Sequence, residues 1–354
     1  MSKMRWLLFV PWVLWAATMC RAQSVVIDLP RQSQGAEVTQ RIGLTDIAIR
    51  YHRPVVGGRT VWGKLVPYGD VWRAGANENT TISFSDAVAI EGQPLAAGTY
   101  GLHMIPGKEE WTVIFSKAAN SWGSFSYRQE EDALRVNVKP EASEFHEALT
   151  YDFDQLKDDS TVVTLRWEKL AAPFKVSINL PETVAANFHR QFRGLRQYTW
   201  ESWNDAADYL ATHKVDLDEA LQYADKSIQL DQRYDNLMTK SEALEAMGRK
   251  EEGAKFRSAA LEKANAVQLY GYARQLQRGG QQQEAMAVFR TQTKKYPNEW
   301  ISHMAASRLH ASEGNFDSAL KEMKTALDGA PDSSKVFVQG LIKRLEAKED
   351  INKS

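Results

Sequence analysis

Side chains able to bind or react gather in one stretch of the chain, from Tyr51 to Thr80. Aromatic faces in such a stretch can stack on sugar rings or other planar groups, and arginine can grip a carboxylate through two hydrogen bonds. The sequence therefore predicts a ligand groove. The alternative is a long loop packed across the core, in which the aromatics are core residues and the arginines satisfy loop carbonyls. The candidate ligand-binding residues are Arg53, Arg59, Trp62, Tyr68, Trp72, Arg73, Asn77, Glu78 and, from a later strand, His103.

Catalysis has less support in these residues. An envelope hydrolase would use Glu78 as acid or base, His103 as base and Arg73 to hold an anion, with the pKa of Glu78 raised by a neighbouring Trp. No nucleophile motif and no metal-binding spacing is present, so catalytic residues stay unassigned and neither a metal nor a cofactor is expected. Because His52, His103 and His146 alternate with apolar strand residues, we expect them to be solvated.

The elements that carry these residues are short strands. Apolar and polar residues alternate at 47–52, 134–139, 163–168 and 174–180. A period of two over such lengths predicts strands with one buried face. Turn signals such as Pro106-Gly107-Lys108 separate the strands, and no alternation of strand and helix is present. The first domain is therefore predicted to be an antiparallel β-sandwich or a barrel-like fold.

A family resemblance rests on many separate motifs of this domain. They are Arg53-Pro54, Gly58-Arg59, Trp62-Gly63, Leu65-Val66-Pro67-Tyr68-Gly69, Val71-Trp72-Arg73, Gly75-Ala76-Asn77-Glu78, Ala97-Gly98-Thr99-Tyr100, Ile105-Pro106-Gly107, Glu110-Trp111-Thr112-Val113-Ile114-Phe115 and Trp122-Gly123. Residues 25 to 170 resemble the DUF2911 family on these motifs. The resemblance implies an exported bacterial β-rich domain of unassigned function, and it assigns no catalytic residue.

After Pro181 the pattern changes to helical repeats. The small residues Ala220, Ala254, Ala285 and Ala319 recur roughly every 33 residues. Gly248, Gly280 and Gly314 precede the last three of these alanines, and Pro297 and Pro331 follow the last two. This pattern predicts an array of helix pairs. Gly would end a helix in a left-handed cap, Ala would let two helices approach closely, and Pro would mark the start of the next pair. The array resembles tetratricopeptide (TPR) repeats and ends in a capping helix.

The N-terminus reads as an export signal. Lys3 and Arg5 precede an apolar run that is too short to span a bilayer, and small residues precede a cut before Gln23. Lipidation of Cys20 in an outer-membrane lipoprotein is an alternative that Met19 disfavours. We expect the protein in the periplasm or outside the cell. The predicted segments are 1–22 as signal peptide, 23–180 as the β domain, 181–199 as linker or first helix and 200–354 as the repeats.

Charge and cysteine content limit the classes of partner that the protein is expected to bind. The 354 residues carry a formal net charge of −1 and show no acidic or basic tail, so a nucleic-acid partner is not expected. The single Cys falls in the signal, so the mature chain is expected to have no disulfide. No membrane span is expected once the apolar signal has been cleaved. The sequence favours a non-catalytic exported protein that binds a glycan or small molecule through the β domain and a protein or peptide through the repeats. The alternatives are the envelope hydrolase and a structural scaffold.

Overall fold

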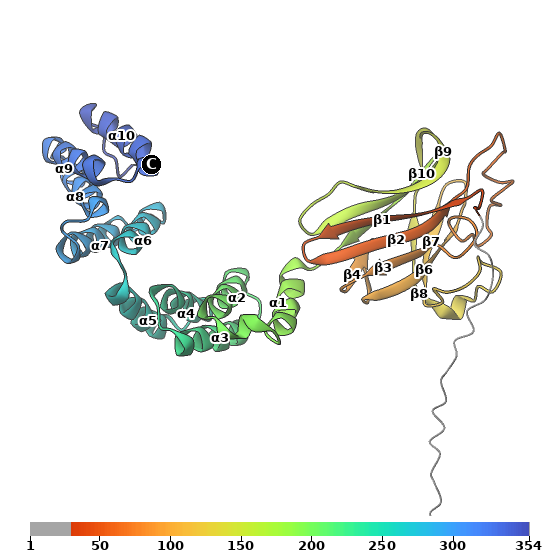
Figure 1. Cartoon of the computed structure of the whole chain (residues 1–354), viewed down its shortest axis with the longest axis horizontal. Coiled ribbons are helices and arrows are strands. Elements are labelled where there is room, and N and C mark those ends of the chain that lie inside the picture. Colours follow the sequence, from red (N-terminus) through yellow and green to blue (C-terminus); the bar gives the residue numbers. More distant parts are fainter. Residues whose placement is uncertain (1–29, 354) are drawn as a thin grey trace, which may run out of the picture. The chain divides into compact units, whose positions relative to one another are not determined.

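The structure is a computed structural model that describes residues 30–353. The chain divides into two compact units, one of residues up to Ile42 and Asp46–Ser177 and one of Gly43–Thr45 and Ile178 onward. We refer to the first as the β unit and to the second as the helical unit (Figure 1). The predicted export signal and Cys20 lie outside the described residues.

The β unit consists of two antiparallel sheets. One has the order β1-β2-β3-β6-β7-β8 and the other β5-β4-β10-β9. The predicted alternation is confirmed: Ile47, Ile49 and Tyr51 of β2 are buried, as are Val163 and Leu165 of β10. The strands are β1 (Gln34–Ile42), β2 (Thr45–Arg53), β3 (Thr81–Phe84), β4 (Val88–Ile90), β5 (Gln93–Leu95), β6 (Gly98–Ile105), β7 (Trp111–Ser116), β8 (Asp132–Val138), β9 (Glu141–Asp154) and β10 (Ser160–Ser177).

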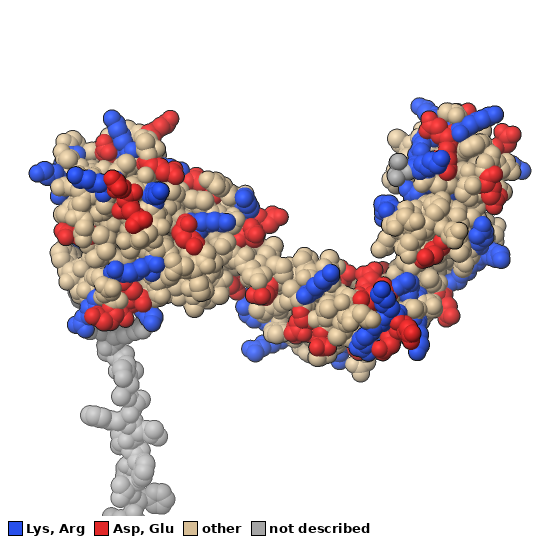
Figure 2. All heavy atoms as spheres, turned by 180° about the vertical axis from the view of Figure 1, so that it is seen from behind, with Lys and Arg blue, Asp and Glu red and all other residues tan. Residues whose placement is uncertain are grey.

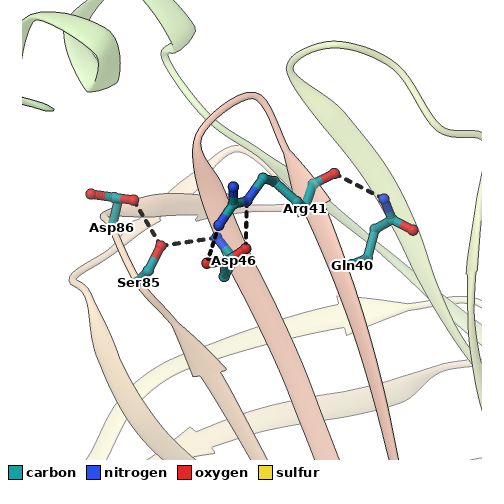
Figure 3. Close-up of polar contacts among 5 residues, drawn as sticks. All are labelled: Gln40, Arg41, Asp46, Ser85 and Asp86. Carbon is teal, nitrogen blue, oxygen red and sulfur yellow. Dashed lines mark hydrogen bonds and ion pairs between the residues drawn. The ribbon is translucent and has the colours of Figure 1, made fainter.

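Side-chain bonds tie the β1–β2 turn to the end of β3. Arg41 donates through Nε and Nη2 to the two carboxylate oxygens of Asp46, both at 2.7 Å. The backbone N–H of Asp46 donates to Ser85 Oγ at 2.9 Å, and that hydroxyl donates to Asp86 at 2.8 Å (Figure 3). The Arg41 hydrogen bond lowers the pKa of Asp46. These bonds fix the register of the hairpin at this end of the sheet.

The helical unit is built from consecutive helix pairs. The first helices of the pairs begin at Trp200, Tyr234, Ala266 and Trp300, which is a period of roughly 33 residues. The helices are α1 (Leu180–Gln191), α2 (Trp200–His213), α3 (Leu217–Leu230), α4 (Tyr234–Ala246), α5 (Lys250–Lys263), α6 (Ala266–Arg278), α7 (Gln282–Lys295), α8 (Trp300–Ser312), α9 (Phe316–Gly329) and α10 (Asp332–Glu346). The predicted architecture of β domain followed by TPR-like repeats is confirmed.

The turns inside the pairs follow the predicted cap chemistry. Gly248, Gly280 and Gly314 have φ values of 82°, 80° and 76°, the left-handed region in which glycine has no Cβ penalty. In the first pair Lys214 takes this conformation, at 55°. Each turn thus reverses the chain and sets the next helix antiparallel to the one before.

One repeat position was assigned wrongly from the sequence. The small residue at the fourth position of each second helix is Ala220, Gly253, Ala285 or Ala319. Ala254, which the sequence placed in this series, is exposed. A Cβ on Gly253 would lie 3.0 Å from the backbone oxygen of Ser241 and 2.9 Å from Glu245 Cγ, so the helices approach more closely here than an alanine allows.

None of the helices between residues 30 and 353 has the length and apolar character to cross a membrane. Lys and Arg side chains are interspersed with Asp and Glu over the face of both units that Figure 2 shows.

Candidate functional site

The tryptophans of the Tyr51–Thr80 stretch pack into the core of the β unit. The ring of Trp62 lies 5.9 Å from Trp72, 4.8 Å from Trp111 and 5.8 Å from Trp167, centroid to centroid. Trp72 stacks on Trp167 at 5.9 Å. Trp111 and Trp167 are fully buried. The cluster therefore fastens the stretch across the sheets, and the ring faces of Trp62 and Trp72 are used in packing.

Two of the predicted arginines satisfy loop carbonyls. Arg53 donates to the Leu149 carbonyl oxygen at 2.9 Å, and Arg59 donates to the carbonyl oxygens of Val55 and Val56. These bonds supply donors to backbone groups that would otherwise lose water on folding. This first half of the stretch matches the packed-loop alternative.

Tyr68 lies against a turn. A Cβ on Gly63, whose φ is 80°, would lie only 2.8 Å from the Tyr68 ring, so the ring covers the glycine closely. The Tyr68 side chain is still 40% exposed. Its contact with Gly63 positions the ring at the surface rather than in the tryptophan cluster.

The second half of the stretch has polar contacts with distant segments. Arg73 donates to the Asn77 carbonyl oxygen at 2.7 Å, and its guanidinium lies 5.2 Å from the centre of the Phe125 ring. Burial lowers the pKa of Arg73. The Asn77 side chain donates to the Ser33 carbonyl oxygen at 3.0 Å. The β7–β8 loop and the segment before β1 therefore meet at residues 73–79.

Glu78 is held as an ionised acceptor. Arg31 donates to its Oε1 at 2.5 Å, and His52 Nε2 lies 3.4 Å from its Oε2. The Arg31 hydrogen bond is the largest cause that lowers the pKa of Glu78. A general acid at neutral pH needs the opposite shift, so the acid role considered for Glu78 lacks its physical basis.

His103 is buried, which corrects the expectation of a solvated histidine. Its side of β6 is covered by residues 117–127 of the β7–β8 loop, a coverage that strand periodicity does not reveal. His103 Nδ1 lies 2.9 Å from Ser124 Oγ, Nε2 lies 3.5 Å from Asn79 Nδ2, and the ring lies 5.3 Å from Tyr127. Burial lowers the pKa of His103 to about 4, so the ring is neutral at pH 7.

A cleft opens beside Glu78 on the outer face of the β1–β2 hairpin. Its main cavity has a volume of about 650 Å³, and Arg50, His52, Glu78, Asn79 and Ser121 are among its lining residues. A second cavity of about 440 Å³ also contains His52 and Glu78 in its lining, together with Arg31. The two cavities therefore share one wall, and we refer to them together as the β cleft.

Two acceptors in this wall make no hydrogen bond. Asn79 is only 7% exposed; its Nδ2 donates to the Ala118 carbonyl oxygen at 3.3 Å, whereas its Oδ1 has no hydrogen-bond partner. The Oε2 atom of Glu78 is also buried without a hydrogen bond. Buried acceptors are rarely left unpaired, and each costs about 1–3 kcal/mol.

Of the sequence-predicted residues, only Glu78 lines the β cleft. Arg73 and Asn77 bond to each other beside it, and His103 contacts the cleft residue Asn79. Arg53, Arg59, Trp62 and Trp72 lie in the packed part of the stretch, and Tyr68 lies at the surface. Arg31 and Asn79 were missed as site residues. Arg31 precedes β1 and has no local signal. Asn79 stood in the polar run before β3, but nothing in the sequence marks it as buried. Within residues 30–353, no cluster of His, Cys, Asp or Glu side chains is placed to hold a metal ion.

The helical unit has a cleft of its own, about 440 Å³ in volume. Its lining comes mainly from the first helices of three pairs, with Thr212 of α2, Met238 and Glu242 of α4, and Tyr272 of α6. Arg257 of α5 also lines it and forms an ion pair with Glu245. We refer to it as the helical groove.

Parts of the chain resemble known proteins. Residues 33–176 match the model of a family described as "Protein of unknown function (DUF2911)", the family that the sequence motifs of the β unit resemble. No curated protein sequence matches the chain. Among solved structures, 48% of the chain matches YrrB, a TPR protein with an unusual peptide-binding site, over 88% of that chain, at 16% identity and a TM-score of 0.27.

A second match is to the hetero-tetramer Cut9–Hcn1 of the APC/C, again over 48% of this chain and over 33% of that chain, at 11% identity and a TM-score of 0.30. The TPR-like character of the helical unit rests on its own repeated helix pairs rather than on these scores.

Proposed function

We propose that the protein is a non-catalytic binding protein with one binding site in each unit. The observation that carries the β-unit site is the pair of buried acceptors without donors, Asn79 Oδ1 and Glu78 Oε2, in the wall of the β cleft. The ligand is a small molecule or glycan rich in hydroxyl groups, because such a ligand supplies O–H donors to these oxygens.

An exposed aromatic beside the cleft supports a sugar as the ligand. The Trp122 ring is 57% exposed, and the Arg31 guanidinium that binds Glu78 lies 5.7 Å from its centre. A flat indole in this place offers a stacking face for the apolar side of a sugar ring. The ligand would then be held by stacking on one side and by hydrogen bonds to Glu78 and Asn79 on the other.

The test is thermal unfolding of the full mature chain with a panel of envelope glycans and free sugars. A ligand at 100 times its Kd stabilises by about 2.7 kcal/mol, which corresponds to a shift of several degrees. Trp122→Ala should reduce the shift while leaving the unliganded melting temperature unchanged. Phe145→Ala removes another exposed aromatic, 53% exposed, and is the matched control. If no ligand of the panel shifts the melting temperature, or if the two variants show equal shifts, the β-unit proposal is contradicted.

The second site is the helical groove, which binds a protein or peptide. Its support is the position of a cavity on the first helices of successive pairs, with both apolar and charged walls. Binding sites of this kind combine buried apolar surface with a few polar anchors.

The route to these partners is export through the N-terminal segment. The mature protein would begin at Gln23 and act in the periplasm or outside the cell. Mass measurement of the protein purified from its native envelope or medium tests this proposal. A chain that retains residues 1–22, or one found in the cytoplasm alone, would contradict it.

A further inference from the structure

The helical groove exists where one repeat departs from the packing of the others. The second helix of each pair has a small residue at its fourth position. Four residues further on, three of these helices carry a buried apolar residue, Ala224, Phe289 or Met323. In α5 this place is taken by Arg257, which is only partly buried. Its guanidinium turns to Glu245 of α4 instead of filling the interior. The space beside α4 and α6 is left open as the groove.

The floor of the groove is apolar. Met238 of α4 and Tyr272 and Leu276 of α6 line it, with exposed fractions of 9%, 9% and 6%. These side chains also belong to the core between the second and third helix pairs, so they are held rigidly. A methylene chain laid on them would bury apolar surface.

The rim of the groove is acidic, and the guanidinium of Arg257 in its lining is paired with Glu245. Glu242 lines the cavity, and Asp208 lies close enough for its repulsion, after partial burial, to raise the pKa of Glu242. Asp205 repels Asp208 in turn. Within residues 30–353, neither Asp208 nor Glu242 forms an ion pair within 4.0 Å, whereas Glu245 is neutralised by Arg257. Two carboxylates without an ion-pair partner therefore lie beside an apolar floor, with Arg257 and His213 acting on them only at longer range.

We infer that the helical groove binds a polypeptide segment through a Lys or Arg side chain, whose aliphatic stem lies on Met238, Tyr272 and Leu276 and whose cationic head lies between Asp208 and Glu242. This inference rests on the proposed partner-binding function of the helical unit. Long cationic side chains have the two properties that the groove needs, an apolar stem and a charged head. A cation at the head position would relieve the repulsion between the two carboxylates.

The test uses the full mature chain and immobilised random hexapeptide libraries whose third residue is fixed as Arg, Lys, norleucine or Glu. We expect the Arg and Lys libraries to retain at least about tenfold more protein than the Glu library. The norleucine library, which keeps the apolar stem without the charge, should fall between them. The double variant Asp208→Asn, Glu242→Gln should lose the preference for Arg and Lys.

The matched control is Asp218→Asn, Glu251→Gln, which makes the same change in net charge on exposed positions of α3 and α5. It should keep the preference. Unchanged circular dichroism would verify that both variants fold. Equal retention of all libraries, or preference for Glu, would overturn the inference while leaving peptide binding in place. Retention of none would contradict the partner-binding function itself.

Discussion

The two units differ in how the carboxylates of their clefts are paired. In the β cleft, Glu78 is paired with Arg31, and what remains unmet is a pair of hydrogen-bond acceptors. In the helical groove, Glu242 has no ion-pair partner in the described part of the chain, and what remains unmet is charge. The difference predicts neutral, hydroxyl-rich ligands for one unit and cationic segments for the other.

The two scaffolds differ as well. The β unit holds its cleft through contacts between segments far apart in the chain, such as the tryptophan cluster that joins Trp62 to Trp167. The helical unit holds its groove through neighbouring helix pairs. Stability in such arrays is roughly a sum of local terms, whereas a single sandwich core unfolds as a whole. A destabilising substitution should therefore lower the stability of the whole β unit, whereas in the helical unit its effect should be confined to neighbouring helix pairs.

The largest expected effect comes from Trp111→Ala. Trp111 is fully buried in contact with Trp62, so removing the ring should cost the β unit about 3–5 kcal/mol. Hydrogen exchange measured by mass spectrometry on the full chain should show faster exchange throughout the β unit and unchanged exchange in α4–α9. If protection from exchange were lost only near position 111, the contrast between the two scaffolds would be contradicted.

A smaller effect separates two helix glycines. Gly271 of α6 has open space where a Cβ would be added, so Gly271→Ala should stabilise the helical unit by about 0.5–1 kcal/mol. Gly253→Ala should not stabilise it, because the new Cβ would lie 3.0 Å from the Ser241 backbone oxygen. Urea unfolding of the two variants gives the comparison. An equal gain at both positions would mean that α4 and α5 are not packed as closely as described.

The smallest effects concern pH and have opposite signs in the two units. Partial burial, then Asp208, raises the pKa of Glu242 above its ordinary 4.5, although Arg257 opposes this shift. The folded helical unit therefore binds this proton more tightly than the unfolded chain, so stability rises as the pH falls through the raised pKa toward 4.5. Arg31 lowers the pKa of Glu78, so this contribution is present above 4.5 and is lost as the pH falls through the lowered value.

Calorimetric melts of two variants check these signs. Glu242→Gln should raise the melting temperature of the helical unit at pH 7, and the difference from the parent chain should shrink at pH 5. Glu78→Gln should slightly lower that of the β unit at pH 7, because exposed ion pairs contribute under about 1 kcal/mol. Differences with the same sign in both units would refute the contrast between paired and unpaired carboxylates.

The strands, the helix pairs and their glycine turns were predictable because they follow from local periodicity and cap chemistry. Alternation at Ile47, Ile49 and Tyr51 needs no knowledge of the rest of the fold. The site was predictable only in part. Glu78 stood in a conspicuous polar run, but its partner Arg31 is separated from it by 47 residues.

Two further features depend on long-range packing. His103 sits on a strand face that would be exposed without the β7–β8 loop, so periodicity predicts solvent where the structure has a neutral, buried ring. The preference for Gly253 over Ala254 depends on how closely α4 approaches α5, which composition does not encode. Both differences arise where tertiary contacts override a local pattern.

The most direct test of two separate sites is hydrogen exchange of the full mature chain with and without the Arg-containing hexapeptide that binds it best. Slower exchange in α2, α4 and α6, with the β unit unchanged, is the result predicted here. Protection confined to α8–α10 or to the β cleft would place the peptide elsewhere and contradict the assignment of the helical groove.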